Sequence, residues 1–267
     1  MALKTDYKDY IPPSGGRKYK ITANSDGSSS VEDITQYQQV GDTWGAEDIN
    51  QVNKLVNGAV YPSLLDNSDF TNPVNQRGVS GTISTAGYFI DRWKLVSGTV
   101  QITAEGLVLN GTISQILENA AGTDVTASAS AGTASYDNST KTFTLTATGQ
   151  TITWAKLEKG SVATPYVPKG YGAELAECLR YFQRVHADWR IYPTLKDMLY
   201  RFSQSTLQVM RIKPTISAHS TPYTFGCTIN ALDAQPMAFT VETKITEQGQ
   251  NSAAASMLGY FDLSADL

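Results

Sequence analysis

Apolar and polar residues alternate with a period of two along much of the chain between residues 61 and 168. Val100 and Ile102 alternate with glutamine and threonine, and Phe143, Leu145 and Ala147 alternate with threonine alone. A period of two places one set of side chains on each face of a β-strand. The pattern therefore predicts half-buried strands with one apolar and one hydroxylated face.

Turn residues separate these runs. Glu105-Gly106 follows the first run and predicts a hairpin, and Asp137-Asn138 stands before the threonine-rich run. Further strands are expected at residues 125–131 and 152–157. Because many short strands follow one another without intervening helices, the segment predicts an antiparallel sandwich.

Between residues 172 and 185 the apolar period lengthens to that of a helix. Leu175, Ala176, Leu179 and Phe182 share one helical face, with glutamates early and arginines late in the segment. We expect an amphipathic helix here that links two β units.

After Pro193 the alternation returns in four runs, at residues 207–209, 225–231, 239–245 and 259–263. Four strands in such a short segment predict a thin sheet, which would be marginal in an isolated monomer. Sharing of faces or edges between chains would make this sheet stable, which favours an oligomer.

The first 60 residues have a different pattern. Asn24-Ser25-Asp26-Gly27 is a turn signal, and short strands are plausible near residues 18–22 and 31–37. After Trp44, helical spacing predicts a short helix whose apolar stripe packs on its own domain or on copies of itself. The candidate residues for attachment or oligomerisation are Trp44, Ile49, Val52, Leu55 and Val56.

Together these patterns predict a mainly β chain: an antiparallel sandwich and a second, C-terminal β domain, connected by short helices, in an elongated oligomer. The expected organisation is an N-terminal segment at residues 1–60, a sandwich at 61–168, a linking helix at 169–186 and a C-terminal β domain at 187–267.

Charge excludes one class of partner. Only 17% of residues are Asp, Glu, Lys or Arg, the net charge is −4, and the basic residues are scattered. No basic stripe exists to neutralise a phosphate backbone, which argues against nucleic-acid binding. No apolar run reaches the roughly 18 residues of a membrane span, and the N-terminus lacks a signal-peptide core. We therefore expect no membrane insertion. We expect synthesis in the cytoplasm, with release by cell lysis as one route to any extracellular role.

The residues needed for catalysis are sparse, so we expect no enzymatic activity. The two histidines, His186 and His219, offer few arrangements for a nucleophile. Four aspartates, Asp66, Asp69, Asp91 and Asp137, could form a glycosidase pair, although Asp beside Ser or Gly more often holds a turn.

Metal ligands are also few. Oxygen ligands cluster at Asp66-Asn67-Ser68-Asp69 but without a full Ca²⁺ loop pattern, so we expect no metal and no cofactor. The two cysteines, Cys178 and Cys227, are interpreted as buried free thiols.

Aromatic side chains carry the more promising binding chemistry, because their faces stack on sugar rings. Trp93 and Trp154 lie in strand-like sequence and are interpreted as core residues. Polar, loop-like sequence surrounds four others, which are therefore the candidate ligand-binding residues: Trp189, Tyr192, Tyr200 and Tyr223.

Two stretches resemble a known family. Residues 64–78, with Leu64-Leu65-Asp66-Asn67-Ser68-Asp69-Phe70, and the following Tyr88-Phe89-Ile90-Asp91-Arg92-Trp93 resemble the opening of a sandwich module in phage and prophage tail-fibre proteins. Residues 154–166 and 176–182 resemble the module's final strand and the helix after it. Residues 210–216 are similar to a strand of many fibre tips, and residues 37–50 to attachment segments of tail appendages.

The resemblance implies a jelly-roll sandwich like those of carbohydrate-binding modules, a tip domain and a homotrimer in a virion tail. It supplies no catalytic residues. Three functions follow as hypotheses: an adhesin that attaches the particle to a host cell-surface glycan or protein, a structural connector in the baseplate or fibre without a host ligand, and an envelope-glycan depolymerase.

Overall fold

The computed structural model describes residues 8, 11, 13–38, 45, 48–53, 56, 61–191, 196–246 and 255–266. The chain forms two compact units, residues 1–60 and 61–267. The chain is mainly β, as the sequence predicts, and all described strand pairs are antiparallel. No described helix is long and apolar enough to cross a bilayer.

The first unit contains a hairpin of β1 (Tyr19–Ala23) and β2 (Ser29–Asp33). The predicted turn joins these strands: the Ser28 amide and hydroxyl both donate to Asp26, and Gly27 has a positive φ. All residues of both strands are exposed. Residues 48–53 are helical, in agreement with the predicted short helix.

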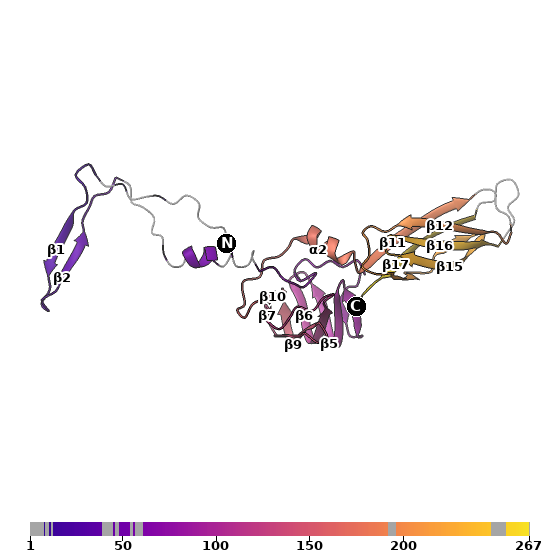
Figure 1. Cartoon of the computed structure of the whole chain (residues 1–267), viewed down its shortest axis with the longest axis horizontal. Helices are drawn as coiled ribbons and strands as arrows, with labels where there is room; N and C mark the ends of the chain where they lie inside the picture. The colour runs from indigo at the N-terminus through magenta and orange to yellow at the C-terminus, as the bar shows by residue number, and fades with distance from the viewer. Residues whose placement is uncertain are drawn as a thin grey trace. The chain divides into compact units, whose positions relative to one another are not determined.

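The second unit begins with two antiparallel sheets that share one core (Figure 1). The larger sheet has the order β3-β5-β6-β9-β8, with β4 also paired to β5, and the smaller one pairs β10 with β7. The strands are β3 (Thr82–Ile83), β4 (Gly87–Ile90), β5 (Trp93–Thr103), β6 (Gly106–Ile116), β7 (Val125–Ala129), β8 (Thr133–Asp137), β9 (Thr142–Ile152) and β10 (Ala155–Lys159). This arrangement is consistent with a β-sandwich, and its β5–β6 hairpin lies where Glu105-Gly106 predicts it.

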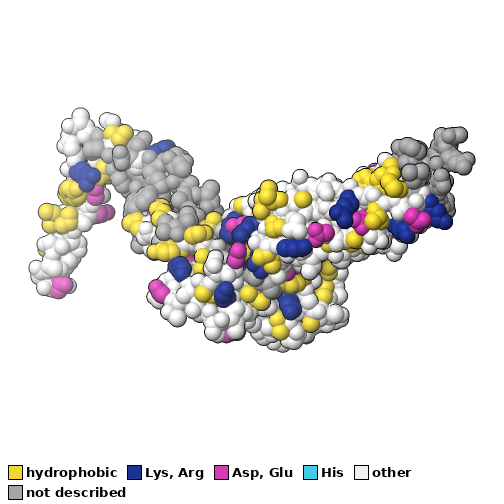
Figure 2. Space-filling model, turned by 45° about the vertical axis from the view of Figure 1, so that its right-hand side comes forward, with side chains coloured by type: hydrophobic (Ala, Val, Ile, Leu, Met, Phe, Trp, Pro, Cys, Tyr) yellow, Lys and Arg dark blue, Asp and Glu magenta, His cyan; other side chains and the backbone are white. Residues whose placement is uncertain are grey.

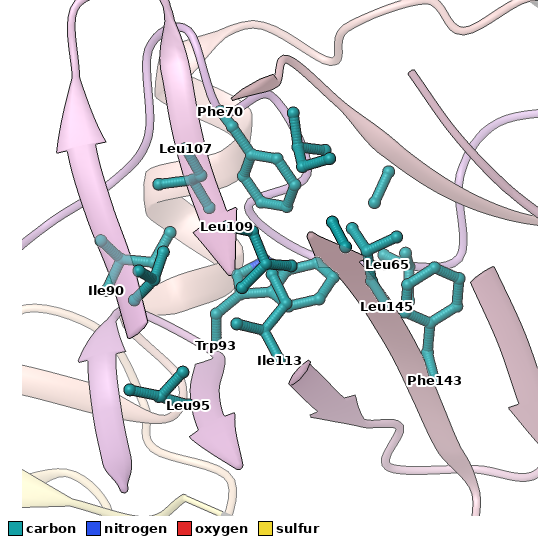
Figure 3. Packing of buried hydrophobic residues seen from close by; sticks show 14 of the residues in the cluster. Leu65, Phe70, Ile90, Trp93, Leu95, Leu107, Leu109, Ile113, Phe143 and Leu145 are labelled. Atoms are coloured by element: carbon teal, nitrogen blue, oxygen red, sulfur yellow. The ribbon is translucent and has the colours of Figure 1, made fainter. Parts of the chain in front are cut away.

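Trp93 lies at the centre of the sandwich core (Figure 3). Its ring contacts Phe70 and Phe143 edge-on, with centroids 5.0 and 5.8 Å away. Because its indole nitrogen donates to the Asn67 carbonyl at 2.8 Å, the large side chain is buried without an unsatisfied donor. The core position predicted for Trp93 is confirmed.

The loop at residues 66–69 is anchored on α2 (Tyr171–Cys178). The Glu174 carboxylate of this helix accepts hydrogen bonds from the backbone N–H groups of Asn67 and Ser68. The side-chain Nδ2 of Asn67 donates to the backbone carbonyls of Val74 and Asp91 at 2.9 and 2.7 Å. These bonds stabilise the positive φ of 53° at Asn67. Residues 66–69 therefore form a buried network of hydrogen bonds inside the fold.

The helix predicted at residues 172–185 is shorter than expected. It ends at Cys178, and Phe182 already begins β11 (Phe182–Ile191). Phe182 and Val185 satisfy helical spacing, but Val185, Ala187 and Trp189 also alternate with charged and imidazole side chains. The alternation prevails because β11 pairs along its whole length with β17 (Ala255–Ser264).

Two further sheets complete the second unit. One contains β11, β17 and β13 (Thr215–Ala218), with β14 (Tyr223–Phe225) also paired to β17. The other has the order β12-β16-β15, from β12 (Leu199–Ser205), β15 (Cys227–Gln235) and β16 (Ala238–Ile245). The strand predicted at residues 207–209 is wrong: Leu207 and Val209 are exposed and lie outside any strand.

The two C-terminal sheets enclose a second core that includes Val185, Phe239, Val241, Met257 and Phe261. The sequence predicted one thin sheet of four strands, whereas the structure has two sheets around one core, one of which includes the long strand β11. Inward side chains of both layers are therefore covered within one chain.

Ionic and cation–π contacts connect the sandwich with the C-terminal sheets. The Arg77 guanidinium pairs with Asp266 and lies 4.0 Å from the ring centroid of Phe182. Gln76 donates to the Phe182 carbonyl at 3.0 Å, and Arg184 donates to the Arg77 carbonyl at 3.1 Å. Gln76 and Arg77 thus hold the first strand and the last residues of the C-terminal sheets.

Candidate functional site

The outward face of the β11-β17-β13 sheet is the candidate functional site. Directly opposed residues of antiparallel strands share one face, and successive residues alternate between faces. Trp189, Met257 and Phe261 point into the core, so the intervening residues of the same strands point outward. This rule assigns His186, Leu258 and Tyr260 to the outer side.

The strand β14 adds two rings to this surface. Tyr223 lies opposite Leu258, and Phe225 lies opposite Ser256. Exposed fractions are 61% for Tyr223, 52% for Phe225, 43% for Leu258 and 50% for Tyr260. The His186 ring lies 4.7 Å from that of Tyr260, tilted by 44°. We call these five residues the outer aromatic face: His186, Tyr223, Phe225, Leu258 and Tyr260.

Fixed polar groups lie beside the rings. Arg184 donates to both carboxylate oxygens of Asp262, at 2.7 and 3.1 Å, and this bidentate geometry holds both side chains in place. The imidazole Nδ1 of His219 lies 3.2 Å from Asp262 Oδ2. A ligand on the rings would therefore meet oriented donors and acceptors at one side.

Of the four predicted ligand residues, Tyr223 belongs to this face. Trp189 does not, and its placement in a loop is wrong: it lies in β11, is 9% exposed, and stacks on Phe202 with centroids 4.1 Å apart. Tyr200 is half-buried against the same core, and Tyr192 lies outside the described residues. Burial of apolar rings between the two layers explains both differences.

Sequence reasoning missed Tyr260, Leu258, Phe225 and His186. The signal was present in β17, because Gly259, Phe261 and Leu263 were predicted to share one face. Their immediate neighbours must then lie on the other face. Pairing of β17 with β11 and β14, which brings His186 and Phe225 beside these residues, cannot be read from local periodicity.

The predicted attachment residues lie in the first unit. Ile49 and Val56 are exposed and Val52 is half-buried, while Trp44 and Leu55 lie outside the described residues. The β1–β2 hairpin of this unit presents another apolar pair: Ile21 and Val31 lie directly opposite each other, 71% and 63% exposed.

The four aspartates considered for glycoside cleavage have structural contacts. Asp66 binds Arg92 at 2.8 Å, and Asp91 accepts the Gln76 amide at 2.7 Å. Asp69 accepts from Thr71, and Asp137 accepts from Ser139 and Thr140, so both hold their own turns. No group of three metal-ligating side chains occurs among the described residues.

Trp154 forms a separate aromatic pair. It is half-buried, and its ring stacks on Tyr166 with centroids 5.3 Å apart and an interplanar angle of 4°. Burial raises the pKa of Tyr166, whose hydroxyl lies 3.3 Å from that of Ser68. Because one face of Trp154 is covered by this partner, the ring is a weaker sugar platform than the outer aromatic face.

Charged side chains of both signs are interspersed on the surface drawn in Figure 2. Comparison with protein-family models, curated proteins and solved structures found no match to this chain. The candidate site is therefore defined by its own geometry: aromatic rings on an exposed sheet, beside a fixed cluster of arginine, aspartate and histidine.

Proposed function

We propose that the chain is a receptor-binding subunit of a phage or phage-derived tail fibre, and that it attaches the particle to a host cell-surface glycan without chemical turnover. The outer aromatic face is the observation that carries this proposal. Three of its rings, His186, Tyr223 and Tyr260, combine an apolar face with a polar group.

Sugar rings present apolar C–H faces and a rim of hydroxyls, and the outer aromatic face has the complementary chemistry. Tyr223 and Tyr260 offer large contact areas with few rotatable bonds, so little conformational entropy is lost on binding. Asp262 and His219 supply hydrogen-bonding groups beside them. This combination supports binding.

The proposed architecture follows the sequence resemblance. Residues 1–60 attach to the particle, residues 61–168 form a jelly-roll sandwich, and the C-terminal sheets form the distal tip of a homotrimer in the virion tail. Exposed Ile21 and Val31 support a contact of the first unit with another chain or a baseplate protein. Several weak sites on one particle would bind through effective concentration, without high affinity at each.

A structural connector is the second candidate. Phe225 and Leu258 carry no polar group, and both are about half exposed, which also suits a protein partner within the particle. A connector would bind its neighbours in the fibre or baseplate and ignore host glycans.

An array of host envelope glycans, probed with the fluorescent full-length protein, separates the two. Tyr223→Ser with Tyr260→Ser is expected to reduce the signal at least tenfold, because both stacking rings are lost. Tyr171→Ser is the matched control, since Tyr171 is an exposed tyrosine at the start of α2.

Equal binding by the double variant would place glycan recognition elsewhere on the chain. Absence of binding to every envelope glycan, together with capture of other purified tail proteins, would favour the connector. Equal melting temperatures of the three proteins would establish that the substitutions act on the surface alone.

A further inference from the structure

The β1–β2 hairpin of the first unit (Figure 1) has regular secondary structure but no core. None of the described residues in this unit is buried. A single two-stranded hairpin is marginally stable at best in water, because it has no second layer to cover its apolar side chains. The hairpin therefore gains stability when another molecule covers it.

The two faces of this hairpin differ in character. Ile21 and Val31 are directly opposed, so they share one face, and alternation along β1 places Tyr19 and Ala23 on the same side. Tyr19 is 51% exposed, and Ile21 and Val31 are still more exposed. We call these four residues the hairpin apolar face. The residues between them on β1 are polar or charged, so the other face suits contact with water.

Both strands have a free outer edge. β1 pairs with β2, and neither strand pairs with a further strand among the described residues. The backbone N–H and C=O groups on these edges can therefore pair with a strand of another chain. A ring of hairpins would leave no edge free, and its curvature would turn one face of every hairpin inward.

The charged residues are segregated by strand, which decides how two hairpins can meet. Arg17, Lys18 and Lys20 lie before or in β1, whereas Glu32 and Asp33 end β2. Pairing of β1 with β1 of another copy would place like charges together, which is destabilising, whereas pairing of β1 with β2 of another copy places opposite charges together. The described side chains of Lys20 and Glu32 are directly opposed in one chain but form no ion pair with each other, so both can pair with another copy.

We infer that the hairpin docks on further copies of this chain, with β1 of one copy antiparallel to β2 of the next, so that the hairpins close into a ring around their apolar faces. The two surfaces that meet are different, and a contact of this kind forms a ring when its rotation closes. The inference rests on the homo-oligomer of the proposed function and adds the contact that builds it. It makes no use of glycan binding, so the glycan array and the experiment below can fail separately.

Cross-linking between chains tests the pairing. Thr22→Cys on β1 and Ser30→Cys on β2 each add one thiol to the exposed polar face, and these two positions are directly opposed in the hairpin. The two full-length variants are co-expressed, each is also prepared alone, and all samples are treated with a short bis-maleimide. The co-expressed sample should give at least fivefold more two-chain product than either variant alone, because β1 meets β2 of the next copy. The native chain gives the background, since Cys178 and Cys227 are buried.

Val31→Asp, added to both variants, should lower the two-chain product at least fivefold, because it places a charge inside the ring. Val162→Asp is the matched control: Val162 is a 73% exposed valine of the second unit, and its substitution should leave the product unchanged. The comparison of co-expressed and single variants stands even if Val31→Asp unfolds the hairpin.

Equal product from one variant alone would indicate pairing of like strands and would overturn the inference. Product at the native background would also overturn it. Sedimentation equilibrium of the native chain would then show whether the oligomer of the proposed function forms through another contact.

Discussion

Asp91 is a buried carboxylate at the contact between the sandwich and the C-terminal sheets. Arg77 Nε lies 3.7 Å from one of its oxygens, and the Gln76 amide donates to the other. Asp266 and the Cys178 thiol are also near enough to interact electrostatically. Burial outweighs the favourable contacts and raises the Asp91 pKa from 3.8 to about 6.

Asp91→Asn is expected to change how stability depends on pH. Because its pKa is raised, the folded chain binds more protons than the unfolded chain between about pH 4 and pH 6. This group therefore makes the unfolding free energy fall as pH rises through that interval, by on the order of 3 kcal/mol. Urea unfolding at several pH values from 4 to 7 measures this dependence. The unfolding free energy of the native chain minus that of Asp91→Asn should decrease as the pH rises.

Asp188→Asn is the control, since Asp188 is an exposed aspartate on β11. The raised pKa would be contradicted if plots of unfolding free energy against pH for Asp91→Asn and the native chain stay parallel across this interval.

Gly98 and Gly111 face each other across β5 and β6. A Cβ on Gly98 would lie 2.2 Å from the Asn110 carbonyl oxygen, and its φ is +80°. Gly98→Ala is therefore expected to lower the unfolding free energy by about 3 kcal/mol or more, through strain and steric clash together. Gly149→Ala should cost only about 1 kcal/mol, because its φ is +69° with nothing near the added carbon. If chemical denaturation gives Gly98→Ala and Gly149→Ala the same loss of unfolding free energy, the chain relieves the clash at Gly98.

At the scale of elements, β10 carries a buried ion pair on one strand face. Lys156 and Glu158 are both fully buried and 2.9 Å apart. Lys156 also donates to the Pro165 carbonyl at 3.1 Å, and Glu158 accepts the Thr164 amide at 2.7 Å. The pair thus binds the segment after β10 to the strand.

Lys156→Met alone is expected to lower the unfolding free energy by about 3–5 kcal/mol, because it leaves Glu158 buried and unpaired. The double variant Lys156→Met with Glu158→Leu should recover part of this loss, since no lone charge remains. Thermal and urea unfolding of both variants measure the difference. A double variant less stable than the single one would show that the contacts to residues 164 and 165 matter more than the charges.

The sequence predicts strands where apolar and polar residues alternate clearly, whether the partner is near in the chain, as for β5 and β6, or distant, as for β17, whose partner is β11. Residues 100–109 form a hairpin, and the adjacent residues Glu105 and Gly106 predict its turn. β11 was missed because Phe182 and Val185 fit a helix as well as a strand. Leu207 and Val209 show the alternation of a strand, but this segment has no pairing partner among the described residues and therefore forms no strand.

The candidate site was less predictable than the fold. The polar surroundings of Tyr223 predicted that its ring is exposed, and the ring is exposed. The same argument wrongly predicted an exposed Trp189. Its strand neighbours Asp188 and Arg190 are polar because they point outward, while Trp189 points into the core. A polar neighbourhood in a strand therefore says little about the residue between. Only the second sheet layer, with Phe202 stacked on the indole, decides where Trp189 points.

At the scale of the whole molecule, the second unit is expected to unfold as one cooperative body. Arg77 contacts both halves, through Asp91 and Tyr88 in the sandwich and through Phe182 and Asp266 in the C-terminal sheets. Arg77→Met removes the charge but keeps an apolar stem. Calorimetry should then resolve two transitions where the native unit gives one. Arg190→Met, an exposed arginine on β11, is the control; a single transition in both variants would mean that other contacts suffice.

The two buried thiols lie in different halves of this unit, Cys178 in α2 and Cys227 in β15. Burial raises the pKa of each, so both react slowly until the surrounding structure opens. Alkylation followed by peptide mass spectrometry would therefore time two separate openings in one native sample, without any introduced label. The alkylation rate of Cys178 would report opening around α2, and that of Cys227 would report opening of the C-terminal sheets.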